Sequence, residues 1–313
     1  MDDRKPLDAQ AVALMVLACA IWAVQPITLK ATADYAAPVM QIGLRSLLAA
    51  VCVYALIRFR GGRVVLVGRV ALAGAFAGLL FSGEFILVGE SLKFTSASHV
   101  VVFMYTAPIF AALGLHWKIP SERLAAMQWA GIGLAAFGIG VAFLGRGESV
   151  PGADMSQRLM GDALALAAGL CWGMTTVLIR TTVLARVPAA HTLFYQLVVA
   201  GIALTMAAAA SGQAAVHLAW PLVGNIAFQA LVVSFFSFLV WFWLLTKYKA
   251  SQLGVFSFMT PMMGVVLGVA LLGEPLTQEF MLGAAGVLCG IMMVTACPWL
   301  RQKAGRSAAT RPA

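Results

Sequence analysis

The sequence predicts an all-α integral membrane protein in which ten transmembrane helices form two inverted five-helix repeats. Composition, the lengths of the apolar segments and an internal repeat each support this fold. Hydrophobic residue types make up 62% of the 313 residues and charged types only 11%, whereas soluble domains average about 45–50% and about 25%. A soluble chain of this length could not bury so much apolar surface, so we expect a lipid bilayer to cover it.

Ten apolar segments are long enough to cross a bilayer, which takes about 20 residues of helix. Pro and Gly residues in the short connections mark the helix ends. The predicted helices cover residues 9–30, 36–57, 69–91, 97–117, 124–145, 160–180, 189–210, 220–246, 250–272 and 278–298.

The basic residues indicate the orientation of these helices. With a cytoplasmic N-terminus, the inward-facing segments carry 16 of the 21 Lys and Arg residues, the outward-facing segments carry 4, and Arg45 lies within a helix. This bias is the positive-inside pattern. It predicts a multi-pass membrane protein with both termini cytoplasmic. It also accounts for the net charge of +9 without a nucleic-acid partner.

An internal repeat relates the two halves of the chain at offsets of 150 to 153 residues. Its best-marked positions carry the same or similar residues in both halves. The pairs are Trp22 with Trp172, Lys30 with Arg180, Pro38 with Pro188, Ala97-Ser98 with Ala250-Ser251, Phe103 with Phe256, Pro108 with Pro261, Glu122 with Glu274, Gly131 with Gly283 and Gly138 with Gly290.

The repeat predicts the domain organisation. Residues 9–145 form the first repeat, 146–159 an outside linker, 160–298 the second repeat and 299–313 a basic cytoplasmic tail. Because each repeat holds five helices, an odd number, the second must enter the membrane from the opposite side, as in many secondary transporters. Two such halves enclose a site between them, so a monomer is expected to be sufficient for function.

The repeated blocks carry a family pattern. The first reads Ala97-Ser98, Thr106-Ala107-Pro108 and Glu122-Arg123-Leu124, and the second reads Ala250-Ser251, Thr260-Pro261 and Gly273-Glu274-Pro275-Leu276. With Trp22, Lys30, Pro38 and Arg45, this resembles the EamA-type branch of the drug/metabolite transporter superfamily. The resemblance covers nearly the whole chain, although Pro120-Ser121-Glu122 departs from Gly273-Glu274. It implies an inner-membrane transporter with inverted repeats, often an exporter of amino acids or other metabolites.

Arg45 and Glu84 are the main charges predicted inside the membrane. A charge there costs at least a few kcal/mol unless it faces a partner or the protein interior. Three interpretations stay open. The two residues bind substrate or a coupling ion in a cavity, they form a structural ion pair between neighbouring helices, or they extend toward the membrane surface.

Pro108 and Pro261 occupy equivalent positions that the sequence places in the middle of helices. Proline removes a backbone hydrogen bond and bends a helix, so these positions predict either hinges beside a cavity or fixed kinks. Glu122 and Glu274 are interpreted as favourable charges at helix N-termini, with gating as the alternative. His99, Gln41 and His191 are polar residues near helix starts, and a histidine there is interpreted as structural, with a proton relay as the alternative.

The function predicted from these features is secondary transport. Tyr105, Trp22 and Trp172 join Arg45 and Glu84 as candidate residues of a cavity between the halves. No nucleotide-binding motif and no catalytic or metal-binding motif is present, and the five cysteines are isolated. The prediction is therefore not an enzyme but a cofactor-free carrier of a small metabolite, an amino acid or related compound, exported by alternating access. The alternative is a membrane enzyme or sensor without transport activity.

Overall fold

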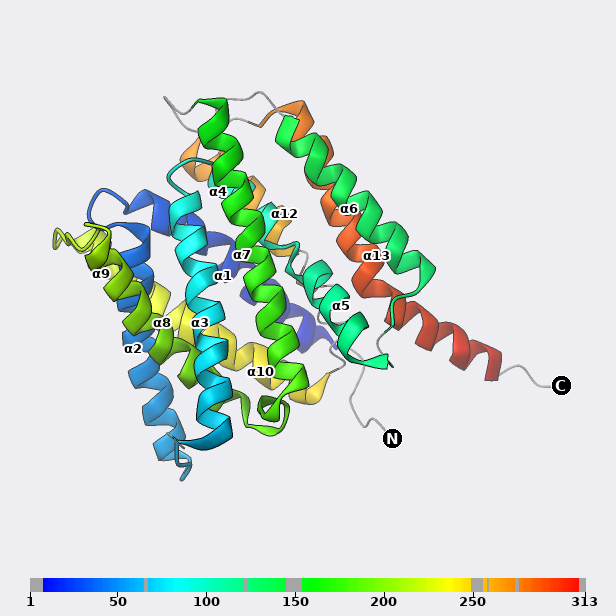
Figure 1. Ribbon diagram of the computed structural model, residues 1–313, viewed down its shortest axis with the longest axis horizontal. Helices are drawn as coiled ribbons and strands as arrows, with labels where there is room; N and C mark the ends of the chain where they lie inside the picture. The colour runs from blue at the N-terminus through cyan, green and yellow to red at the C-terminus, as the bar shows by residue number, and fades with distance from the viewer. Residues whose placement is uncertain are drawn as a thin grey trace.

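The computed structural model describes residues 8–64, 67–120, 123–144, 154–248, 256–257, 259–273 and 276–309, and this described part of the chain is helical throughout (Figure 1). Side chains fix several helix starts: Asp8 accepts a hydrogen bond from the Ala11 amide, and Asp154 forms a capping box with Gln157. The helices are α1 (Ala9–Ala31), α2 (Pro38–Phe59), α3 (Gly68–Ser91), α4 (Ala97–Met104), α5 (Ala107–Lys118), α6 (Ala126–Leu144), α7 (Met155–Thr181), η2 (Val183–Arg186), α8 (Ala189–Ala210), α9 (Trp220–Ala227), η3 (Phe228–Ser237), α10 (Phe238–Lys247), α12 (Met259–Leu272) and α13 (Gln278–Ala309).

Within the described residues, 8 helices are long and apolar enough to cross a membrane, and two shorter apolar helices cover Ala126–Ala142 and Met259–Leu272. The all-helical membrane fold is therefore confirmed. Ten membrane crossings in two inverted repeats remain a prediction. Most helix ends lie within two residues of those predicted, but α7 begins at Met155 and α13 continues to Ala309. Glu122 and Glu274 lie outside the described residues.

Two predicted helices are not regular. The segment 97–117 is broken at Tyr105 and Thr106, and Pro108 lies in the first turn of α5. Pro261 likewise lies in the first turn of the α12 segment that begins at Met259. For Pro108 the expected mid-helix position is therefore wrong, because this proline lies in the first turn of α5, where a helix needs no amide donor. The predicted helix before Pro261 includes residues 250–255 and 258, which lie outside the described residues. The segment 220–246 contains a π-helix, η3, between α9 and α10.

Packing between the two halves of the chain is reciprocal. In Figure 1, α6 and α13 lie side by side at one edge of the bundle. The helix α7 packs on α3 and on α4 and α5, just as α1 packs on η3 and on α12. Each helix of one half thus contacts the same kind of neighbour in the other half, as the internal repeat requires.

The α6–α13 crossing carries this reciprocity to single residues. A Cβ atom at Gly138 would lie 2.6 Å from the Gly283 carbonyl oxygen, and one at Gly131 would lie 2.7 Å from the Gly290 carbonyl oxygen. The higher-numbered glycine of α6 therefore meets the lower-numbered glycine of α13, so the helices run antiparallel. The glycines act here as packing residues that let two backbones approach closely.

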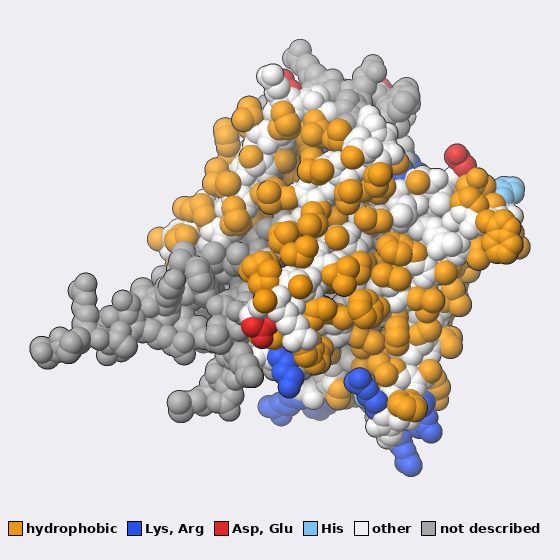
Figure 2. Space-filling view, turned by 180° about the vertical axis from the view of Figure 1, so that it is seen from behind, with side chains coloured by type: hydrophobic (Ala, Val, Ile, Leu, Met, Phe, Trp, Pro, Cys, Tyr) orange, Lys and Arg blue, Asp and Glu red, His pale blue; other side chains and the backbone are white. Residues whose placement is uncertain are grey.

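The molecular surface agrees with a membrane location. Figure 2 shows a broad hydrophobic face over the helices, with Lys and Arg side chains gathered toward one end. Arg58, Arg60, Arg63 and Arg69 lie around the connection from the end of α2 to the start of α3, which Figure 1 places at this end, the basic end. The corner between α3 and α4 lies at the other end, which we call the corner end.

Candidate functional site

Arg45 lies in the interior of the bundle, with an exposed fraction of only 1%. Its Nη1 donates a hydrogen bond of 2.5 Å to Gln229 Oε1 in η3, and its guanidinium lies 4.6 Å from the centre of the Phe85 ring. With the Gln25 amide turned to present its oxygen, that oxygen accepts from Nη1 and Nη2 at 3.2 Å. These neutral contacts hold the cation in place, but its buried Nε has no hydrogen-bond partner.

Glu84 projects from α3 into the same interior and is 5% exposed. Its Oε2 atom is enclosed and has no hydrogen-bond partner. Arg45 attracts it electrostatically. Among the described ion pairs, however, none joins the two side chains within the 4.0 Å that defines a salt bridge. The direct pair considered from the sequence is therefore not formed, and Glu84 is a buried carboxyl group with unused hydrogen-bonding capacity.

A polar layer extends from Arg45 toward the corner end. Gln229 Nε2 donates to the Gln25 carbonyl at 3.0 Å and to Thr28 Oγ1 at 2.8 Å. One turn away, Asn225 Nδ2 donates to Gln41 Oε1 at 2.7 Å. The layer thus joins α1, α2 and the α9–η3 helix through side-chain hydrogen bonds, and Gln41 is part of it.

The predicted aromatic residues lie on two sides of the interior. Tyr105, at the break between α4 and α5, makes an edge-to-face contact with Trp172 on α7, with ring centres 5.2 Å apart. Trp22 on α1 donates its indole hydrogen to Ser237 Oγ at 2.8 Å and contacts Trp241 edge to face. The helix α3, which carries Glu84, packs on α7, the helix of Trp172.

Sequence reasoning missed Asn225 and Gln229. A signal was available, because the two lie four residues apart on one helix face, as Gln41 and Arg45 do. Polar residues at such spacing inside apolar segments face the protein interior. The π-helix that carries Gln229 had no comparable signal, although π-helical turns are frequently found at functional sites.

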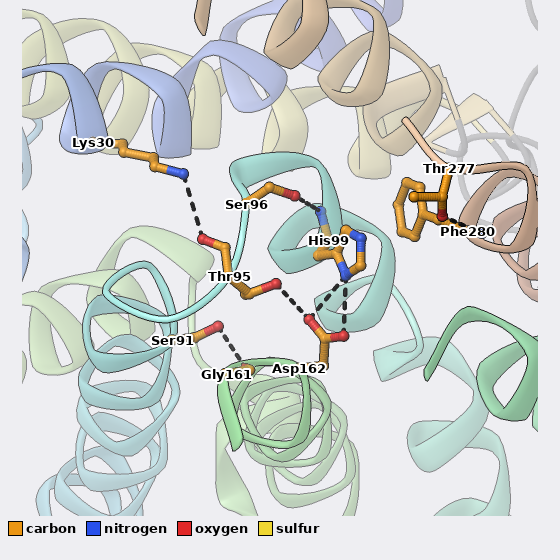
Figure 3. Close-up of polar contacts among 9 residues, drawn as sticks. All are labelled: Lys30, Ser91, Thr95, Ser96, His99, Gly161, Asp162, Thr277 and Phe280. Atoms are coloured by element: carbon orange, nitrogen blue, oxygen red, sulfur yellow. Dashed lines mark hydrogen bonds and ion pairs between the residues drawn. The ribbon is translucent and has the colours of Figure 1, made fainter. Parts of the chain in front are cut away.

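A second polar cluster lies at the corner end (Figure 3). Asp162 on α7, 3% exposed, accepts a hydrogen bond of 2.6 Å from Thr95 Oγ1. His99 Nδ1 lies 2.9 and 3.0 Å from the two oxygens of that carboxylate. The His99 ring stacks on Phe280 of α13, with ring centres 3.9 Å apart, and Lys30 donates to the Thr95 carbonyl at 3.4 Å. Asp162 was not singled out from the sequence, and His99 was.

The comparison with known proteins identifies relatives of the whole chain. The model of the EamA-like transporter family matches residues 9–144 and again residues 159–296. The uncharacterized transporter YoaV of Bacillus subtilis is 26% identical over 208 residues, 65% of this chain and 68% of its own length. A probable amino-acid metabolite efflux pump of Salmonella typhimurium is 24% identical over 288 residues, 89% of this chain and 92% of its own.

A solved crystal structure is similar in fold. It superposes with a TM-score of 0.65 at 19% sequence identity, covering 93% of this chain and 98% of that chain. At this identity the likeness concerns the fold alone.

Proposed function

Since this chain belongs to the EamA-like transporter family and is a multi-pass membrane transporter, we propose that it is a secondary transporter that exports a small metabolite by alternating access. The family resemblance seen in the sequence is confirmed. The relatives are transporters, which points away from an enzyme.

The observation that carries the proposal is the buried carboxyl group of Glu84. An ionisable group enclosed in a membrane protein without a hydrogen-bond partner is expensive and is usually retained for function. The residue before Glu84, Gly83, faces α7, because a Cβ atom there would lie 3.6 Å from Cys171 Sγ. We propose that this carboxylate binds a cationic group of the substrate or a coupling proton.

Arg45 supplies the complementary charge. Its contacts in this structure are neutral amides and an aromatic ring, and its Nε is unpartnered. A zwitterion could therefore place its carboxylate toward Arg45 and its ammonium group toward Glu84. An amino acid or related compound has these two charges, and the Salmonella relative is named a probable amino-acid metabolite efflux pump.

Alternating access requires that the two halves move relative to each other, so that the site opens to one side of the membrane at a time. The reciprocal packing of α7 and α1, and the antiparallel crossing of α6 and α13, support two inverted repeats related by an axis through the interior. Pro108 and Pro261, each at the start of a helix segment, are proposed as the hinges. With the site enclosed by one chain, a monomer is sufficient.

The proposed orientation places the basic end in the cytoplasm. The excess of Lys and Arg in the predicted inward segments supports it, and so does their gathering at one end of the molecule in Figure 2. A reporter fused to the C-terminal tail should then be active only if it functions in the cytoplasm. Periplasmic activity there would contradict the ten-helix count.

The experiment that tests the function has two stages. Untargeted metabolite analysis of the medium and cells, with the protein overproduced or absent, identifies the exported compound. Transport of that compound into proteoliposomes is then measured for the wild type and for Glu84→Gln. We expect Glu84→Gln to abolish transport while the protein remains folded.

Glu90→Gln is the matched control. Glu90 lies on the same helix, is partly exposed and pairs with Lys93 at 2.7 Å. The same chemical change there should leave transport near the wild-type rate. Full transport by Glu84→Gln would remove Glu84 from the site and leave the aromatic and proline positions as candidates.

A further inference from the structure

The cluster around Asp162 joins the parts of the bundle that meet at the corner end. Thr95 belongs to the connection between α3 and α4, His99 to α4, Asp162 to α7 and the stacked Phe280 to α13 (Figure 3). Ser91 Oγ also donates to the Gly161 carbonyl at 2.7 Å, next to Asp162. One buried carboxylate therefore holds the start of α7 against the corner of the first half.

Separation of α7 from this corner would have a clear cost. Asp162 is 3% exposed and Thr95 fully buried, so parting them leaves a carboxylate that must be rehydrated or re-paired. Alternating access opens one end of the bundle at a time. The contacts of Asp162 are broken if α7 moves away from α4 at this end.

His99 makes the strength of this contact dependent on pH. A neutral imidazole donates one hydrogen bond from Nδ1, whereas an imidazolium forms an ion pair with the carboxylate. Histidine is the side chain whose charge ordinarily changes between about pH 5 and 8. Because the ion pair exists only while α7 and α4 are together, protonation of His99 favours the closed arrangement.

Other charged groups lie on the elements that carry or adjoin the pair. Lys30 of α1 reaches the Thr95 carbonyl, and Glu90 and Lys93 at the end of α3 pair with each other. Arg158 lies one helical turn before Asp162 on α7, and Glu279 precedes Phe280 on α13. Of these groups in the part of the chain that the structure describes, His99 is the one whose ring nitrogen contacts the Asp162 carboxylate.

The basic end has a related contact without histidine. Tyr248 Oη donates to Asp8 Oδ2 at 2.7 Å, and Tyr248 follows Thr95 by the same 153 residues that separate Ala250 from Ala97. Asp8 caps α1, the first helix of its half, as Asp162 lies near the start of α7, the first helix of the other half. Each end therefore has a hydrogen bond to an aspartate near the first helix of one half. Unlike a histidine, however, a tyrosine does not change charge between about pH 5 and 8.

We propose that Asp162 and His99 form a proton-controlled latch that holds the corner end of the transporter closed and releases it when His99 loses its proton. This inference rests on the proposed alternating access. It adds regulation by the pH on the corner side, which the proposed orientation makes the outside of the cell. The latch needs no substrate and is distinct from the interior site at Glu84.

The test measures the opening of this end directly. Spin labels are attached to cysteines introduced at Lys93, in the corner, and at Ser156, at the start of α7, both exposed. The background is a variant with all five native cysteines replaced by alanine that keeps the circular dichroism spectrum of the wild type. Distances between the labels are measured by pulsed electron paramagnetic resonance in lipid nanodiscs without substrate, from about pH 5.5 to about pH 8.5.

We expect a short distance at low pH and a growing longer population at high pH, with the short-to-long ratio falling about tenfold. His99→Gln keeps a hydrogen-bond donor but cannot titrate, so its distance distribution should not change with pH. Asp162→Asn should raise the long population at low pH. His116→Gln, which alters a histidine on α5 outside the cluster, should keep the pH response of the parent.

Two results would overturn the latch. One is a distribution that does not change with pH in the parent protein, and the other is an undiminished pH response in His99→Gln. Because the measurement uses no substrate, either result can occur whether or not the protein exports a metabolite. Conversely, a normal pH response in a protein that transports nothing would refute the proposed function and not the latch.

Discussion

At an offset of 153 residues, the two halves of the predicted repeat place different chemistry on α3 and η3. Ser237 follows Glu84 by 153 residues, the same spacing that relates Ala97 to Ala250. Ser237 accepts a hydrogen bond from Trp22 of α1, while Glu84 is buried with its Oε2 unpartnered. The second half uses this position for a satisfied packing contact, and the first half places an ionisable group there.

This difference separates scaffold from chemistry. Reciprocal packing of the helices is needed wherever two similar halves share one interior, so it reappears at α6 and α13. A buried carboxyl group in one half alone contributes nothing to such packing and costs desolvation energy. We therefore expect transport to depend on Glu84 in the first half, whereas the stability of the fold depends on packing in both halves.

The largest effect should come from equal truncations at the two corresponding positions. Glu84→Ala removes the proposed binding carboxylate and should lower transport in proteoliposomes by about 100-fold or more. Ser237→Ala removes one hydrogen bond with Trp22 and should change the transport rate by less than about threefold. Equal losses in the two variants would mean that both positions serve transport and that the contrast between the halves is wrong.

A second comparison concerns the cation. Arg45→Met leaves the Gln229 oxygen without its donor and Glu84 without an attracting charge. The free energy of unfolding should therefore fall by about 3 kcal/mol. Adding Glu84→Gln should recover part of this loss, since no uncompensated charge stays buried, but should not restore transport.

The corresponding position in the second half is Tyr195, 150 residues later, and it supplies the control. Tyr195→Phe should cost about 1 kcal/mol or less. Unfolding in mixed detergent micelles, followed by circular dichroism, measures these changes. Full transport by the folded double variant of Arg45 and Glu84 would show that the two charges are structural.

The α6–α13 crossing tests where the halves are alike. A Cβ atom at Gly138 would lie 2.5 Å from the Val287 nitrogen and 2.6 Å from the Gly283 carbonyl oxygen, whereas one at Gly140 would meet no atom within 4 Å. Gly138→Ala should therefore lower the free energy of unfolding by about 1–3 kcal/mol. Gly290 lies against Gly131 as Gly138 lies against Gly283, so Gly290→Ala should have a similar effect. Gly140→Ala should have almost none. Clearly unequal effects at Gly138 and Gly290 would argue against a two-fold relation at this crossing.

The fold was more predictable from the sequence than the site. Long apolar segments, the repeat and its glycines act locally or at fixed spacing, so they identify helices and some packing faces, such as that of Gly131 and Gly138. The site depends on contacts between distant residues, including Arg45 with Gln229 and Asp162 with His99. No periodicity encodes which buried polar groups meet. The same limit explains why a direct Arg45–Glu84 pair was considered, although Arg45 instead contacts Gln229 of the second half.

The smallest expected effect concerns the two equivalent tryptophans. Trp22 Nε1 donates to Ser237 Oγ, which is buried and also donates to the Val233 carbonyl. Trp22→Phe leaves the Ser237 oxygen without its donor and should cost about 1 kcal/mol from the hydrogen bond, in addition to the loss of ring contact. Trp172 contacts Tyr105 edge to face, a contact that a phenylalanine ring can keep in part. Trp22→Phe should therefore lower the free energy of unfolding by about 1 kcal/mol more than Trp172→Phe does. Repeating both substitutions in a Ser237→Ala background isolates the hydrogen bond, because there the difference should disappear. If the difference persists in that background, the asymmetry between the tryptophans lies in ring packing and not in the Ser237 contact.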